Sequence, residues 1–217
     1  MKSISKPLNL LVLLVLISSC NSNKKVMLNN GKDLENWNIF VSDPEMDPGD
    51  VFWVEDGMIN TSGIPHAYIR TKDQYSNFKL HVEWRWTEEP TNSGVLIHVQ
   101  GEDLIWPLCI ECQLKHENAG DIVLIGKGSG ITVDGTEHLI TSEENRYEVI
   151  AKVEDVSENP AGEWNSYDIT SLDGTIEVIV NGILQNTGTA MTLTSGNIGL
   201  QSEGSPMQFR NVFLELL

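Results

Sequence analysis

Apolar residues alternate with polar ones over much of this chain, with the period of two that β-strands require. The alternation is clearest in five segments: residues 80–86, 95–99, 110–114, 176–180 and 198–201. Because successive side chains of a strand point to opposite faces, each segment predicts a strand with one buried and one exposed row. The expected buried rows include Leu80, Val82, Trp84 and Trp86; Val95, Ile97 and Val99; and Ile110, Cys112 and Leu114.

Turn signals between these segments favour antiparallel pairing. Asn181-Gly182 separates two apolar runs by the two residues typical of a tight hairpin. Residues 118–144 combine five glycines with short β-branched runs, which predicts loops and up to two short strands. Residues 154–161 predict an exposed loop, and 209–217 a closing strand. We therefore predict an all-β fold, with one domain built as a two-sheet antiparallel sandwich.

The N-terminus has the pattern of a bacterial secretory signal. Lys2 and Lys6 precede an apolar run from Leu8 to Ile17, and Ser18-Ser19-Cys20 follows. The run is shorter than the about 20 residues of a membrane span, and its end resembles the lipobox of bacterial lipoproteins. We expect residues 1–19 to be removed, Cys20 to carry lipid, residues 20–26 to form a tether and residues 27–217 to form the domain. The protein would then be exported and membrane-anchored in a bacterial cell envelope, facing the periplasm or the exterior.

The charge of the chain excludes some partners. The formal net charge is −17, and removal of residues 1–19, which contain two lysines and no acid, makes it −19. Nucleic acids and anionic substrates require clustered Lys and Arg, so neither is expected as a ligand. The net negative charge does not by itself identify a ligand.

Two cysteines remain after Cys20. In a strand, Cys109 and Cys112 would point to opposite faces about 10 Å apart, beyond the reach of a disulfide, which needs Cα atoms within about 7 Å. The sequence shows no second Cys or His pair to complete a zinc site. We expect Cys112 to be a small core residue.

Short polar signatures also recur in a fixed order: Leu28 to Leu34, Trp53 to Gly57, Tyr75 to Arg85, Asn92-Ser93-Gly94, Glu111-Cys112-Gln113, Gly162-Glu163-Trp164-Asn165, Gln201 to Gly204 and Phe209-Arg210-Asn211. In order and spacing these signatures resemble the 3-keto-disaccharide hydrolase family over roughly residues 27–217. The resemblance implies a concanavalin A-like jelly roll that cleaves 3-keto-glycosides, commonly in glycan-degrading bacteria.

The candidate catalytic residues lie on the rows opposite the buried ones. Glu111 is the first choice for an acid or base, because apolar neighbours would raise the pKa of its carboxyl group. His98 is the second choice, since imidazole titrates near neutrality. Glu83 would serve as a second carboxylate in a direct hydrolysis. If their strands are neighbours, as the resemblance implies, these residues share one polar groove.

The candidate substrate-binding residues have side chains suited to sugar hydroxyls and to a ketone oxygen. They are Arg85, Gln113, Asn165, Gln201 and Glu203, together with Trp106, whose indole would stack on an apolar sugar face. Purely structural explanations stay open for several of them. Glu111 would pair with Lys115, Arg85 with Glu83, and Trp106 would plug one end of the sandwich.

The leading hypothesis is a glycoside-cleaving enzyme that removes the C2 proton of a 3-keto-glycoside, expels the C1 oxygen by β-elimination and hydrates the product. The alternative is a noncatalytic, lectin-like glycan-binding lipoprotein, because fold does not determine function. A structural subunit of a surface complex is a third hypothesis. The sequence requires no cofactor, is compatible with a divalent metal and leaves the oligomeric state open.

Overall fold

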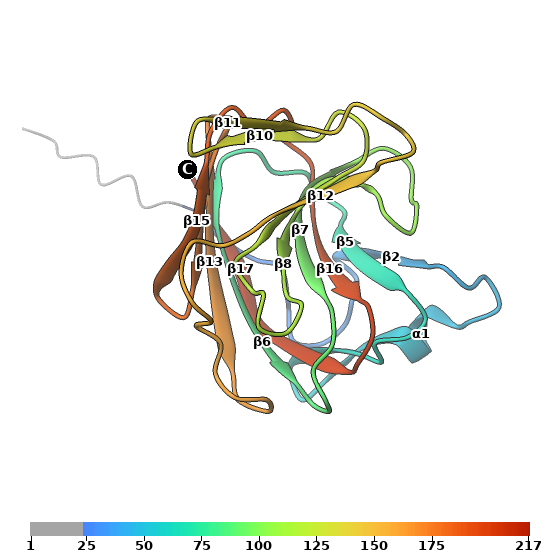
Figure 1. Ribbon diagram of the computed structural model, residues 1–217. Coiled ribbons are helices and arrows are strands. Elements are labelled where there is room, and N and C mark those ends of the chain that lie inside the picture. The colour runs from blue at the N-terminus through green and yellow to red at the C-terminus, as the bar shows by residue number, and fades with distance from the viewer. Residues whose placement is uncertain (1–23) are drawn as a thin grey trace, which may run out of the picture.

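Two antiparallel sheets make up most of the computed structural model, which describes residues 24–217 (Figure 1). The eight-stranded sheet has the order β15 (Ile183–Gly188), β14 (Thr175–Val180), β13 (Asn165–Leu172), β6 (Phe78–Trp86), β17 (Met207–Leu216), β4 (Met58–Thr61) and β3 (Phe52–Glu55), with β1 (Lys25–Met27) paired to β17. The seven-stranded sheet has the order β12 (Tyr147–Ile150), β9 (Ile122–Ile125), β8 (Leu108–Gln113), β7 (Gly94–Gln100), β16 (Asn197–Ser202), β5 (Ala67–Thr71) and β2 (Trp37–Val41).

Two smaller elements accompany the sheets. The hairpin of β10 (Gly130–Val133) and β11 (Thr136–Leu139) lies across one end of the sandwich (Figure 1). The single turn of helix α1 covers Pro48–Val51. The arrangement confirms the predicted all-β, two-sheet jelly roll. No helix among residues 24–217 is long and apolar enough to cross a membrane.

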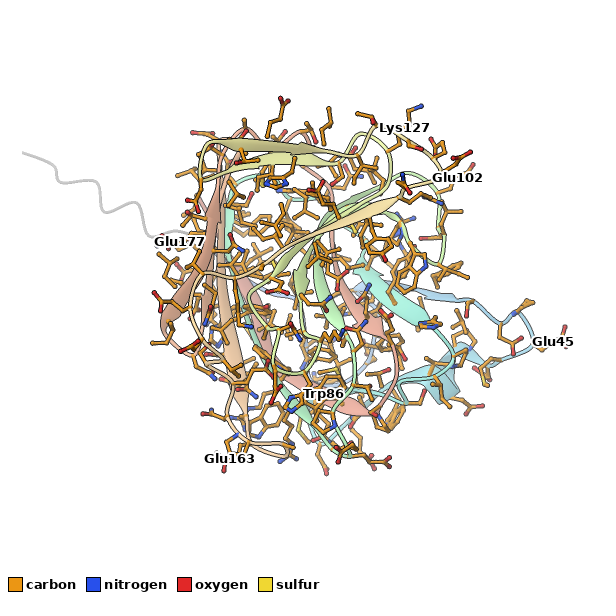
Figure 2. All side chains as sticks on the ribbon, in the orientation of Figure 1. Glu45, Trp86, Glu102, Lys127, Glu163 and Glu177 are labelled. Atoms are coloured by element: carbon orange, nitrogen blue, oxygen red, sulfur yellow. The ribbon has the colours of Figure 1, made fainter. Side chains whose placement is uncertain are left out.

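The core between the sheets is built from the rows that alternation predicts on β6 and β8. Leu80, Val82 and Trp84 are at most 1% exposed, and the Trp84 ring lies 4.9 Å from that of Tyr167 on β13. Trp86 ends the β6 row at the lower end of the sandwich, opposite the end that carries Glu102 and Lys127 (Figure 2). Burying this row removes apolar surface from water at roughly 25 cal/mol per Å², which stabilises the sheet pair.

Both cysteines of β8 are buried free thiols on opposite faces, as predicted. Cys112 belongs to the main core, whereas Cys109 belongs to a smaller apolar cluster with Tyr68, Leu96 and Val123. This cluster lies on the outer face of the seven-stranded sheet.

The alternation of β7 breaks at His98, and the prediction for this strand is wrong beyond Ile97. The register with β8 shifts between Ile97 and Gln100, and His98 has a φ of 54°. Such a bulge exchanges the two faces of the strand for the residues that follow. His98 therefore points into the core, where its ring lies 5.6 Å from Phe78, while Val99 joins the outer cluster.

Other local predictions have mixed outcomes. Asn181 and Gly182 form the predicted hairpin turn, both with positive φ, between β14 and β15. Residues 118–144 contain three short strands, β9 to β11, one more than expected. Strand β1 begins at Lys25, so the fold includes two residues that we assigned to the tether. The predicted signal peptide and Cys20 lie outside the described residues.

Candidate functional site

A cleft of about 500 Å³ lies on the outer face of the seven-stranded sheet, a volume typical of small-molecule sites. Side chains of β8, β9 and β12 line it together with residues from five loops. The lining residues are Asn92, Trp106, Glu111, Gln113, Lys115, Asn118, Asp121, Val123, Ile125, Arg146, Tyr147, Val149 and Glu203. Four of the residues that the sequence analysis selected, Trp106, Glu111, Gln113 and Glu203, meet here.

Gly94 determines how the polar side chains of this cleft come together. It lies on β7, between β8 and β16, which carry Glu111 and Gln201. A Cβ atom at position 94 would lie 2.3 Å from Glu111 Oε1 and 2.5 Å from Gln201 Oε1. The Glu111 and Gln201 side chains fill the space that a side chain at position 94 would need. This explains why the Asn92-Ser93-Gly94 signature contains a glycine.

Glu111 is a buried acid that keeps its proton at neutral pH. It is 4% exposed, and burial raises the pKa of its carboxyl group to about 8, helped by the negative charge of Glu203 and opposed by a hydrogen bond with Gln201. Glu111 Oε1 and Gln201 Oε1 are both buried acceptors without a hydrogen-bond partner. Desolvation by burial therefore dominates, and the hydrogen bond with Gln201, which favours the ionised form, does not offset it.

Glu203 is the second carboxylate of the cleft. It follows β16 and forms a backbone bridge with Asn92. Burial raises the pKa of the Glu203 carboxyl group, while a hydrogen bond from Asn92 and the positive charge of His66 act in the opposite direction. Two neighbouring carboxyl groups do not both ionise readily, so a protonated Glu111 beside an ionised Glu203 is the favoured arrangement.

His66 and Asn92 are site residues that the sequence analysis missed. His66 shares a small hollow beside the cleft with Trp106, Gln201 and Glu203, and its ring meets the Trp106 ring edge-on at 5.4 Å. Nothing in the local sequence around His66 sets it apart, because only tertiary packing brings the loop before β5, which carries it, to the site. Asn92 had a signal, since it begins the Asn92-Ser93-Gly94 signature.

Gln113 and Trp106 are positioned to contact a ligand. Gln113 Oε1 accepts a hydrogen bond from the Lys115 amide at 2.9 Å, which leaves the side-chain NH₂ as its donor to a ligand. Trp106 is 38% exposed, and its backbone oxygen accepts a hydrogen bond from Arg146 at 3.4 Å. An exposed indole beside polar groups is well suited to stack on a sugar ring.

Glu83 and Arg85 lie outside the cleft, so the predicted single groove is wrong. Their strand β6 belongs to the eight-stranded sheet, and the two side chains occupy its outer face, on the other side of the sandwich. Glu83 pairs with Arg210 at 2.6 Å, and Arg85 donates to Gln208 at 2.8 Å. Although burial acts to raise the pKa of Glu83, hydrogen bonds from Asn211 and Arg210 lower it.

The two signatures that contain Trp164 and Arg210 also meet on this opposite face. The guanidinium groups of Arg210 and Arg85 lie 4.0 and 4.7 Å from the centre of the Trp164 ring. These cation–π contacts fix the loop before β13 onto β6 and β17. Their arrangement explains both signatures as structural features.

His98 and Asn165 are buried structural residues. His98 is 0% exposed and its Nε2 lies 2.9 Å from Ser171 Oγ, and burial lowers the pKa of the imidazole to about 4. Asn165 Oδ1 accepts hydrogen bonds from Asn159 N and Asn181 Nδ2, both at 2.7 Å. Neither residue lines the cleft, so the catalytic role predicted for His98 and the substrate-binding role predicted for Asn165 are wrong.

No group of three or more His, Cys, Asp or Glu side chains that could hold a metal ion occurs within residues 24–217. The cleft and the hollow beside it contain carboxyl, amide, imidazole and indole groups. Together they supply a proton donor, a proton acceptor, hydrogen-bonding amides and an aromatic face.

Solved structures share this fold. Two structures of a candidate glycosyl hydrolase from Parabacteroides distasonis are each 25% identical to the chain. One has a TM-score of 0.63 over 89% of this chain and 94% of that one, and the other a TM-score of 0.64 over 90% and 100%. A β-glucanase from Bacillus licheniformis, 11% identical, has a TM-score of 0.55 over 89% of this chain and 97% of its own, and thus shows the fold alone.

Comparison by sequence identifies the family. A search among curated protein sequences found no match. A family profile described as the 3-keto-alpha-glucoside-1,2-lyase-like domain matches residues 24–215, which is nearly all of the described chain. The chain therefore belongs to the family of 3-keto-alpha-glucoside-1,2-lyase-like domains.

Proposed function

We propose that this protein is an exported enzyme that cleaves the glycosidic bond of a 3-keto-glycoside in the cleft above Glu111. The observation that carries the proposal is the buried carboxyl group of Glu111, protonated at neutral pH beside a second carboxyl group, Glu203. A glycan-binding protein has no need for a buried acid with a raised pKa, because a hydroxyl or an amide binds sugars without the cost of desolvating a carboxyl group.

The chemistry follows from the substrate. A ketone at C3 acidifies the proton on C2, so a base can remove that proton. The C2–H electrons then form the C1=C2 double bond, the C1–O bond breaks, and the departing oxygen takes a proton from an acid. Addition of water across the resulting enone places a hydroxyl group on C1 and a proton on C2, which releases the free 3-keto sugar.

The residues of the cleft have matching roles in this scheme. Glu203, as the ionised carboxylate, removes the C2 proton, and Glu111 donates a proton to the departing oxygen. The amides of Gln113 and Asn92 hold the ketone and hydroxyl oxygens. Trp106 stacks on the sugar ring. These roles replace those predicted for His98 and Arg85, which lie outside the cleft.

The test is incubation of the mature protein, purified in detergent, with 3-keto-trehalose and a 3-keto-glucoside, while mass spectrometry follows the 3-keto sugar and the enone. We expect product from the wild type and none from Glu111→Gln. The matched control is Glu83→Gln, on the opposite face of the sandwich, which should keep its turnover. A parallel sample with EDTA reports any contribution from a divalent cation, with which the sequence is compatible.

A negative result is equally informative. Binding of these sugars without turnover, unchanged in Glu111→Gln, would instead support the glycan-binding hypothesis. Loss of turnover in Glu83→Gln to the same degree as in Glu111→Gln would remove the assignment of the cleft as the reaction site.

The proposal includes a lipid anchor at Cys20. The signal-like sequence up to Ser19 supports it, and β1 starts at Lys25, which leaves only a few residues between the lipid and the fold. Mass spectrometry of the mature N-terminus is expected to find a lipidated Cys20. A chain that retains Met1 would contradict both export and anchoring.

A further inference from the structure

The cleft changes character along its length. Gln113, Lys115, Asn118 and Asp121 line the end where β8 finishes and β9 begins. In the other direction along the same strands the lining becomes apolar, with Val123 and Ile125 on β9 and Tyr147 and Val149 on β12. Glu111 lies between the two parts.

Strand register places the apolar residues directly beside Glu111. Glu111 pairs with Val123, which in turn pairs with Val149, and the neighbouring row runs from Cys109 through Ile125 to Tyr147. Directly paired residues share a face, and neighbouring strands lie about 4.8 Å apart. The apolar patch of Val123, Ile125, Tyr147 and Val149 therefore extends about 10 Å from Glu111 to the edge of the sheet.

The outer half of this patch is open to solvent. Tyr147 is 72% exposed and Val149 is 50% exposed, whereas Val123 and Ile125 beneath the cleft are at most 5% exposed. Trp106, 38% exposed, lines the same cleft and is tied to this side by the hydrogen bond that its backbone accepts from Arg146. Exposed apolar and aromatic side chains that adjoin a reaction site mark the contact surface of a ligand.

We infer that this patch binds the leaving group, and that the leaving group is an apolar, aromatic aglycone rather than a second sugar. The inference rests on the proposed function, because Glu111 protonates the oxygen that joins the sugar to the leaving group. With the sugar over the polar part of the cleft, the group attached to that oxygen extends over Val123 and Val149. Hydroxyl groups of a second sugar would lose their water there without gaining partners.

An aromatic ring gains from the same surface. It removes apolar area from water against Val123 and Val149, and it can meet the ring of Tyr147 in offset or edge-on geometry. Arg146, at the outer margin beside Tyr147, is available to polar substituents of the ring. The natural substrates would then be 3-keto-glycosides of phenols or other aromatic alcohols.

The test compares two substrates with the same 3-keto-glucosyl group, benzyl 3-keto-glucoside and 3-keto-trehalose, in the mature protein and in the double variant Tyr147→Thr/Val149→Thr. Threonine is β-branched, which suits an edge strand, and its small polar side chain removes the apolar surface of the patch. The matched control is Ile183→Thr, which changes an exposed apolar residue at the edge of the other sheet. Comparing each variant with the wild type on the same substrate cancels differences in leaving-group reactivity.

We expect the double variant to lose about tenfold in kcat/KM for the benzyl substrate, mainly through KM, with less than about twofold change for 3-keto-trehalose. Equal losses on both substrates, or no loss on the benzyl substrate, would overturn the aglycone site and leave the proposed function intact. If the wild type turns over neither substrate, the proposed function fails and the inference fails with it.

Discussion

The carboxyl group of Glu111 and the amide of Gln201 meet above Gly94, although they come from strands that are not neighbours. Strand β7 separates β8 from β16, and only a residue without a side chain on β7 lets the two groups converge. The Glu111 carboxyl group that fills this space is buried, and its burial is the main cause of its raised pKa. This relationship links a backbone feature of the sheet to the protonation state of the proposed catalytic acid.

Gly94→Ala should disable the site while the fold persists. The added methyl group would displace Glu111 and Gln201, and a misplacement of about 1 Å can cost about 10²-fold in rate. We expect turnover to fall by about that factor and stability by about 1–3 kcal/mol, as for other overpacked sites. Gly49→Ala is the control, since its added carbon would meet only the Asp47 side chain, at 3.3 Å. Unchanged turnover in Gly94→Ala would contradict the proposed geometry.

Glu111 should make the protein less stable as the pH rises. Its pKa is about 8 in the folded state and near 4.5 when unfolded, so between these values the folded state holds a proton that the unfolded state has released. The free energy of unfolding therefore falls across this window. Glu111→Gln removes the effect and should be more stable than the wild type at pH 9 by up to about 5 kcal/mol, with little difference below pH 4.5.

Urea unfolding of both proteins at pH 5, 7 and 9 measures this difference. If the difference in the free energy of unfolding between the two proteins stays the same at all three pH values, Glu111 ionises normally. That result would also remove the basis for its role as a proton donor at neutral pH.

Glu203→Gln should lower the pKa of Glu111. The negative charge of Glu203 contributes to the raised pKa of Glu111, so its removal favours ionisation. A ¹³C NMR titration of labelled glutamate carboxyl groups should show the Glu111 midpoint at a lower pH than in the wild type. An unchanged midpoint would mean that the two carboxyl groups are not coupled, and Glu89→Gln, which lies outside the cleft lining, serves as the control.

His98 should make the protein sensitive to acid. The folded pKa is about 4 against an ordinary value of 6.5, so the unfolded state binds the extra proton between these values. Stability is fully present above pH 6.5 and falls by up to about 3 kcal/mol as the pH drops towards 4. His98→Asn, which tolerates the positive φ at this position, should lack that component when unfolding is measured at pH 7 and pH 4.5. An equal loss in both proteins would assign the sensitivity to other groups.

Local pattern alone determined the strands and most of their buried rows. The alternation from Leu80 to Trp86 and the Asn181-Gly182 turn depend on interactions between near neighbours, which a sequence displays directly. The same reasoning placed Glu111 and Gln113 on the outer row of their strand and Trp106 on a loop, and the structure has all three in the cleft.

Tertiary structure alone decided which of these rows share a face. Glu83 and Glu111 lie on equally regular strands, yet β6 and β8 belong to different sheets, and alternation carries no information about sheet membership. At His98, a single residue with a left-handed backbone forms a bulge that exchanges the two faces of β7. His66 reached the site from the loop before β5. Each of these outcomes depends on contacts between residues far apart in the chain, whose energies no local pattern records.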